Sequence, residues 1–102
     1  YMLDKLCNDP SEIVRAAVAR QGGDICESLI NDKSDVVRRN AAIYSNSPEL
    51  LINDNSIDVR GAVLKRLIEN GDYNNIYYMI NDSCFEIRSK AINVLFDWIG
   101  DC

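Results

Sequence analysis

A motif that occurs four times along the 102 residues constrains the fold more than any other feature of the sequence. In each copy an Asn-Asp pair is followed, six residues after the Asp, by an Arg, and a Val or Ile immediately precedes that Arg. Self-similarity with a period of roughly 20–50 residues is typical of repeat proteins. We therefore predict a repeat protein with four copies, which are LCNDPSEIVRAAV, LINDKSDVVRRNA, LINDNSIDVRGAV and MINDSCFEIRSKA, beginning at Leu6, Leu29, Leu51 and Met79.

Each copy is predicted to contain the start of a long helix. An Asp side chain can accept the free backbone N–H groups of a first helical turn, so Asp9 is expected to be an N-cap. Pro10 would occupy the first helical position, where its missing N–H costs nothing. Glu12 would complete a capping box with Asp9. The helices are expected to end near residues that tolerate a left-handed backbone, such as Gly22 and Gly71.

The distance between copies limits how much structure each unit can hold. Successive Asp residues of the motif are 23, 22 and 28 residues apart. A unit of 22 or 23 residues is too short for two helices of about 11 residues each with their turns. We therefore expect a short or 3-10 helix before the motif in the early units, at residues 24–30 and 48–52. The longer last unit has room for a proper α-helix at residues 72–80.

These patterns predict an all-α fold, an α-solenoid of about four short two-helix repeats. No segment alternates apolar and polar residues as a half-buried strand would, so no sheet is expected. Residues 1–102 are interpreted as a single helical-repeat domain with units at roughly 1–22, 23–46, 47–71 and 72–102. The chain begins with Tyr and is apolar at both ends, so a fragment of a longer solenoid is an alternative interpretation.

The repeats resemble two related families. The segments NDPSEIVRAAVARQGGDICESLINDKSDVVR and NAAIYSNSPELLINDNSIDVRGAV resemble leucine-rich repeat variants over roughly residues 6–64, and the last unit is similar to a HEAT-like repeat. The resemblance implies a right-handed superhelix of two layers, with the longer helix of each unit lining one face. The leucine-rich variant family also carries an iron–sulfur cluster on a separate cysteine-rich segment. Such a segment is missing here, so we expect no cofactor. The resemblance specifies a fold and says little about function.

The repeated acidic and basic residues are predicted to form a structural ladder. Arg can donate two parallel hydrogen bonds, so the Arg of one unit would reach the Asp or the turn carbonyls of its neighbour. A ligand site is the alternative, and it is less favoured because a functional site is rarely repeated in every unit. The ladder residues are Asp9, Arg15, Asp32, Arg38, Asp54, Arg60, Asp82 and Arg88.

The inventory of reactive side chains argues against catalysis and metal binding. The chain has no His, which removes the commonest general base and metal ligand. Its four Cys are far apart, without knuckle spacing for zinc. We expect no enzyme activity, no catalytic residue and no metal site. We also expect reduced thiols in a cytoplasmic protein, with Cys7 as a small buried hydrophobe and a secreted disulfide framework as the alternative.

The distribution of charge gives one indication of function. Eleven Lys and Arg against sixteen Asp and Glu leave a net charge of −5, which argues against nucleic acid and anionic membranes. Most bases nevertheless fall in the predicted long helices, as complementarity to the helix dipole alone would also produce. If stacked units align these positions, they form a polar, locally basic strip for a protein or peptide, and a nucleic acid is the alternative partner. No small-molecule substrate and no membrane association are expected. The strip residues are Arg20, Arg39, Asn40, Lys65, Lys90 and Asn93.

Overall fold

The described part of the chain is entirely helical, as predicted. The computed structural model describes residues 2–100, except for the side chain of Leu3. Over this range it contains α-helices and short 3-10 helices and no strand. The elements are α1 (Met2–Leu6), α2 (Glu12–Ala19), α3 (Gly23–Glu27), α4 (Asp35–Tyr44), η1 (Pro48–Leu51), α5 (Ile57–Asn70), α6 (Tyr73–Ile76), η2 (Tyr77–Asn81) and α7 (Phe85–Gly100).

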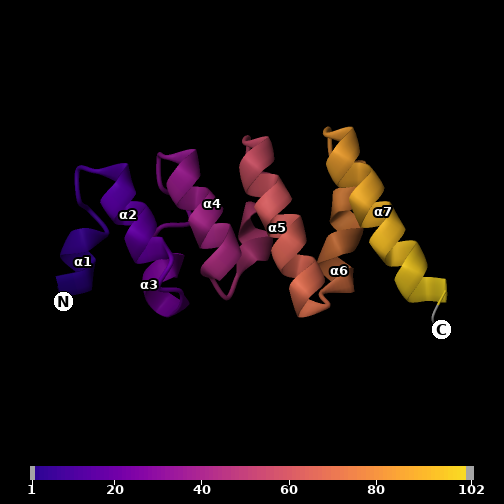
Figure 1. Cartoon of the computed structure of the whole chain (residues 1–102), viewed down its shortest axis with the longest axis horizontal. Helices are drawn as coiled ribbons and strands as arrows, with labels where there is room; N and C mark the ends of the chain where they lie inside the picture. The colour runs from indigo at the N-terminus through magenta and orange to yellow at the C-terminus, as the bar shows by residue number, and fades with distance from the viewer. Residues whose placement is uncertain (1, 101–102) are drawn as a thin grey trace.

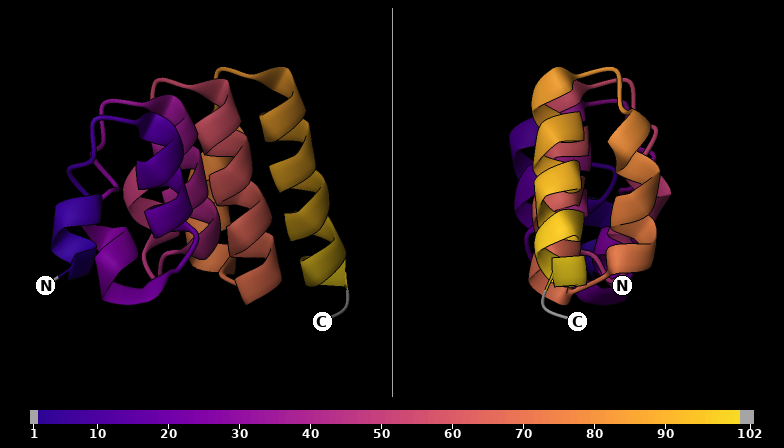
Figure 2. Two further views of the ribbon diagram at one scale, coloured as in Figure 1. Left: turned by 60° about the vertical axis from the view of Figure 1, so that its left-hand side comes forward. Right: turned by 90° about the vertical axis from the view of Figure 1, so that its right-hand side faces the viewer.

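The four long helices stand side by side in the order of the sequence (Figure 1). Helix α2 packs against α4, α4 against α5, and α5 against α7. The short elements form a second layer behind them (Figure 2), in which α3, η1 and α6 each contact the long helix that precedes and the one that follows, and η2 contacts α7. The molecule is accordingly elongated, with principal extents of 48 × 24 × 15 Å. None of the helices within residues 2–100 combines the length and the apolar character that a membrane span requires.

The core lies between the two layers and is built by equivalent positions of the motif. The β-branched residue before the Arg is fully buried in the central units, as Val37 and Val59 show. Three residues after the Arg, a small or aliphatic residue such as Ala41 or Val63 is also fully buried. Burying an aliphatic side chain of the size of Val or Leu contributes roughly 1.5–3 kcal/mol. The motif therefore supplies much of the apolar surface that holds the layers together.

The short segment of the last unit buries residues at a period of three. Ile76 and Met79 are both buried, and Tyr73 three residues earlier is half-buried. A 3-10 helix has three residues per turn and places such positions on one side. The predicted α-helix at residues 72–80 is therefore wrong in its second half, because α6 ends at Ile76 and continues as the 3-10 helix η2. The expected short elements at residues 24–30 and 48–52 are present as α3 and η1.

The long helices begin two residues later than the sequence analysis expected. Helix α2 starts at Glu12, so Pro10 lies outside it, and the N-cap is Ser11, whose side chain accepts the N–H of Ile13. Asp9 instead accepts the N–H of Ser11 at 2.9 Å. Glu12 does not close a capping box with Asp9, and its carboxylate accepts the hydroxyl of Ser34 in the next unit at 2.7 Å. A Ser two residues after the Asp thus occupies the cap position and leaves the Asp free for a second bond.

The turn after α2 brings the chain very close to the end of α4. Gly22 and Gly23 both have positive φ, 73° and 65°. A Cβ on Gly22 would lie 3.0 Å from the carbonyl oxygen of Tyr44, while a Cβ on Gly23 would meet nothing within 4 Å. Substitution of either glycine therefore strains the backbone, and Gly22 is the more restricted of the two because its ψ of −170° is open almost only to glycine and its Cβ would meet Tyr44.

Replacing these glycines should cost different amounts of stability. Gly23→Ala should lower the free energy of unfolding by about 1–2 kcal/mol, because an L residue is strained at positive φ. Gly22→Ala should cost about 1–3 kcal/mol more, because its Cβ also forces the Tyr44 backbone to move. Urea unfolding of both variants beside the wild type measures the difference. Equal losses for the two variants would contradict the close packing of this turn.

Candidate functional site

The repeated Arg and Asp residues connect each unit to the next. In the central link, Arg38 Nε donates to Asp54 Oδ2 at 2.8 Å and Arg38 Nη2 donates to Asp54 Oδ1 at 3.3 Å. Arg38 Nη1 donates at 2.9 Å to the carbonyl oxygen of Asp32, which belongs to the same unit as the Arg. Each guanidinium therefore holds its own turn and the next one. Equivalent Nε bonds of 2.9 Å join Arg15 to Asp32 and Arg60 to Asp82.

The Asp carboxylate binds two partners at once. Both oxygens of Asp54 accept hydrogen bonds from Arg38, and Oδ1 also accepts the backbone N–H of Ser56 at 2.9 Å. Ser56 is the N-cap of α5, so the carboxylate fixes the turn that leads into this helix. One side chain thereby couples the start of a helix to the preceding unit. The same backbone bond occurs from Ser11 to Asp9, from Ser34 to Asp32 and from Cys84 to Asp82.

Burial makes these ion pairs structural. Arg15 and Arg60 are only 5% and 8% exposed. The hydrogen bond from Arg38 to Asp54 raises the pKa of the Arg38 guanidinium above its usual value, so the charge is permanent. Protein oxygens already accept hydrogen bonds from Nε and Nη1 of these three Arg residues, so each guanidinium has few donors left for a ligand.

Truncating one partner of a central pair should destabilise the fold strongly. Asp54→Ala removes the acceptor of Arg38 and of the Ser56 N–H, and Arg60→Ala leaves Asp82 without its cation. Loss of one partner leaves an uncompensated buried charge, so each change should cost about 2–4 kcal/mol.

Arg88→Ala is the matched control for this experiment. Within residues 2–100 no carboxylate lies within ion-pair distance of Arg88, so this change should cost about 1 kcal/mol or less. Chemical unfolding monitored by circular dichroism gives the free energies. Similar losses at Arg60 and Arg88 would show that the bond between units contributes nothing.

The strip residues are distributed less regularly than the sequence analysis expected. Arg20, Arg39, Lys65, Lys90 and Asn93 are exposed. Asn40 is not part of an outward face, which corrects the prediction. It is 8% exposed because the side chain folds back onto α4 and donates to the carbonyl oxygen of Val36 at 2.9 Å.

Three bases of the strip line two adjoining hollows on the outer faces of the long helices. The first, the outer groove, has a volume of about 400 Å³ and includes Arg39 of α4 and Lys65 of α5. The second lies between α5 and α7 and is lined by Lys65 and Lys90 among others. Gly61 and Lys65 line both, so the two hollows adjoin along α5. Arg20 and Asn93 line neither of them.

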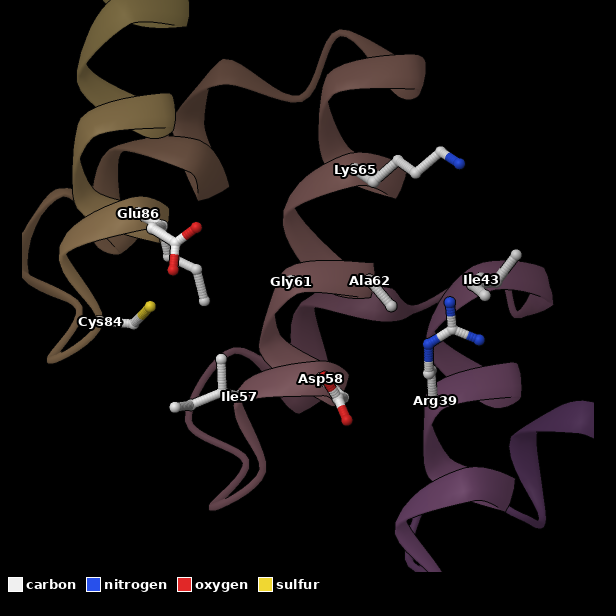
Figure 3. A pocket seen from close by; sticks show the side chains of 10 residues that line it. Arg39, Ile43, Ile57, Asp58, Gly61, Ala62, Lys65, Cys84 and Glu86 are labelled. Carbon is white, nitrogen blue, oxygen red and sulfur yellow. The ribbon is translucent and has the colours of Figure 1, made fainter.

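The outer groove is mixed in chemistry, and α5 runs through its middle (Figure 3). Arg39 and Asp58 lie on one side of α5, and Cys84 and Glu86 lie on the other. Gly61 lines the groove from the centre of α5, where an added Cβ would meet nothing within 4 Å. The sequence pattern did not indicate these groove residues, apart from the two bases. A Gly inside a predicted helix, where it is unfavourable, is the signal that could have indicated this place.

The last unit carries an aromatic cluster at its outer edge. Tyr73 of α6 stacks on Trp98 of α7, with ring centroids 4.6 Å apart. Tyr77 and Tyr78 are exposed and contact each other edge to face at 6.0 Å. Tyr73 is half-buried, so among these tyrosines only the outer two rings are fully at the surface.

Comparisons of the chain with family models, with curated proteins and with solved structures find no match. The arrangement of side chains is therefore the basis for a functional proposal.

The cysteines differ in their surroundings. Cys7, Cys26 and Cys84 are free thiols, and Cys102 lies outside the described residues. Cys7, expected to be buried, is half-buried and accepts a hydrogen bond from Ser28 at 3.4 Å. Cys26 is fully buried, and this burial, followed by the charge of Glu27, raises the pKa of its thiol to about 11. Within residues 2–100 no cluster of three or more Cys, Asp or Glu side chains is placed to hold a metal ion.

Alkylation should separate these thiols. At neutral pH iodoacetamide should modify Cys7 and Cys84 in the folded protein, because both are partly exposed. Cys26 should react only on unfolding, because it is buried and protonated. Because folding raises the pKa of the Cys26 thiol from 9.0 to about 11, the protonated thiol contributes fully to stability below pH 9.0. This contribution is lost as the pH rises through about 11. Peptide mass spectrometry after timed labelling reports each site, and rapid modification of native Cys26 would contradict its burial.

Proposed function

We propose that this chain is a non-catalytic binding module that holds a segment of a partner protein across the outer faces of α4, α5 and α7. The observation that carries the proposal is the adjoining pair of hollows, which share Gly61 and Lys65 on α5. In this proposal the row of units is a short right-handed α-solenoid of the kind that the leucine-rich variant and HEAT-like repeats imply. Such proteins use extended faces for binding.

The chemistry of the outer groove favours a polypeptide. Arg39 and Lys65 offer two cations for acidic side chains of the partner, and Ile43 and Ile57 offer apolar contacts beside them. Specific sites in proteins combine apolar walls with a few polar groups that fix orientation. A short extended segment carrying both acidic and apolar residues would match this lining.

The same lining argues against nucleic acid as the partner. Asp58 and Glu86 line the outer groove with the two bases, and Glu69 lines the second hollow with Lys65 and Lys90. A phosphate backbone would meet these carboxylates, and the chain carries a net charge of −5. Nucleic-acid binding depends on neutralising successive phosphates with bases. A protein partner is therefore the proposal, and nucleic acid is an outcome of its test.

Peptides selected from a random display library on the wild-type chain should depend on the outer groove. Gly61→Leu fills the space above α5 and should abolish binding. The variant should still fold, because a Cβ at this position meets no other atom within 4 Å. Ser89→Leu is the matched control. It lies on α7 one residue after the motif Arg, as Gly61 does on α5, and does not line the outer groove. This variant should bind as the wild type does.

A charge-reversed variant tests the bases separately. Changing Arg39, Lys65 and Lys90 together to Glu should abolish binding of the selected peptides, while exposed substitutions usually cost under about 0.5 kcal/mol each in stability. Fluorescence anisotropy measures the affinities and melting curves measure folding. Wild-type affinity in both groove variants would place the binding face elsewhere. Tight, steeply salt-dependent binding of duplex DNA would favour the nucleic-acid alternative.

A further inference from the structure

The ladder ends in two complementary groups at opposite ends of the molecule. Arg88 donates through Nη1 to the carbonyl oxygen of Asp82 at 2.8 Å, as the other ladder arginines do in their own units, and also to that of Ser83 at 3.0 Å. Its Nε has no carboxylate partner within residues 2–100. Asp9 holds the N–H of Ser11 through Oδ1, and among the described residues its Oδ2 receives no Arg. These are the donor and the acceptor that pair in every internal link.

The C-terminal end also exposes apolar surface at a position that the other units bury. Ile92 lies four residues after Arg88 and is 39% exposed. Phe96 and Ile99 follow at helical spacing and are exposed too, so α7 carries an apolar stripe. The equivalent residues of the preceding units are buried, and they are Ala19, Ala42 and Leu64.

The N-terminal end exposes apolar surface in a corresponding way. Val14 is half-buried, whereas Val37 and Val59 at the same motif position are fully buried in the central units. Ile13 and Met2 of the same end are exposed. Figure 1 shows α1 and α2 at one end of the row and α7 at the other. Each end therefore exposes apolar surface of the kind that an adjacent unit covers elsewhere in the row.

We propose that a second copy of this chain docks head to tail, with its α1 and α2 against α7 of the first. In this arrangement Arg88 donates to Asp9 of the next copy, and the apolar stripe of α7 covers the side of α2 that exposes Val14. The contact repeats the geometry of the internal links, so it uses an interface that the chain already forms three times.

Two physical features set the expected behaviour of this assembly. The joined surfaces are different patches of the molecule, so each added copy presents a new free end and the assembly is open. The contact is only one unit wide, so the association should be weak and strongly dependent on concentration. The proposal is independent of the partner proposed for the outer groove.

Sedimentation velocity over a concentration series tests the proposal. For the wild type the weight-average sedimentation coefficient should rise continuously with concentration. Arg88→Asp should weaken the association by about tenfold or more, because a charge-assisted bond becomes a repulsion with Asp9. Asp9→Arg should do the same, and the variant with both changes should regain a large part of the association because the charges are exchanged between the ends.

Two further variants test whether the association depends on the apolar stripe of α7 and whether a change of charge elsewhere also weakens it. Ile92→Glu with Phe96→Glu changes only exposed side chains, so it should stay folded by circular dichroism and remain monomeric. Lys65→Asp removes a groove base away from both ends and should associate as the wild type does, although peptide binding weakens. A wild type that stays monomeric, a closed dimer that does not grow, or undiminished association of the Ile92 and Phe96 variant would each overturn the proposal.

Discussion

The hydrogen-bonded ion pair between the Arg of one unit and the Asp of the next is the interaction on which the rest of this structure depends. Arg38 holds the turn carbonyl of its own unit and the carboxylate of the following unit, so it fixes the distance between the two turns. The long helices that follow these turns are then placed side by side. The hollows on their outer faces result from that alignment, with Gly61 providing the space.

Much of the fold follows from the repeat itself, because equivalent residues must occupy equivalent environments. The helical class and the position of the short elements could be read from the spacing of the motif. The cap could not, because Asp54 and Ser56 are both good caps, and only the structure shows that Ser56 takes the cap position while Asp54 accepts its N–H. The change from α6 to η2 also escaped, since Ile76 and Met79 reveal a period of three only when their burial is known.

The candidate site was less predictable than the fold because it depends on neighbours across helices. Arg39, Lys65 and Lys90 stand at different positions relative to the motif, so the repeat does not predict that they line adjoining hollows. Helical spacing predicted an exposed Asn40, but its side-chain amide donates a hydrogen bond to the Val36 carbonyl oxygen of the same helix, and the residue is buried. The carboxylates Asp58 and Glu86 reach the same groove from different helices, which changes a basic strip into a surface of mixed charge.

Each ladder Asp also couples its unit to the preceding one while it fixes the start of its own helix. When one unit opens locally, its Asp leaves, and the guanidinium of the preceding unit loses its counter-charge while still bonded to its own turn. The following unit loses an Arg but keeps the N–H bond that sets its helix start. Local opening of one unit therefore leaves a buried charge without its counter-charge on each side, an Arg in the preceding unit and an Asp in the following one. Opening of one unit should accordingly weaken both neighbours, and amide hydrogen exchange can measure this coupling.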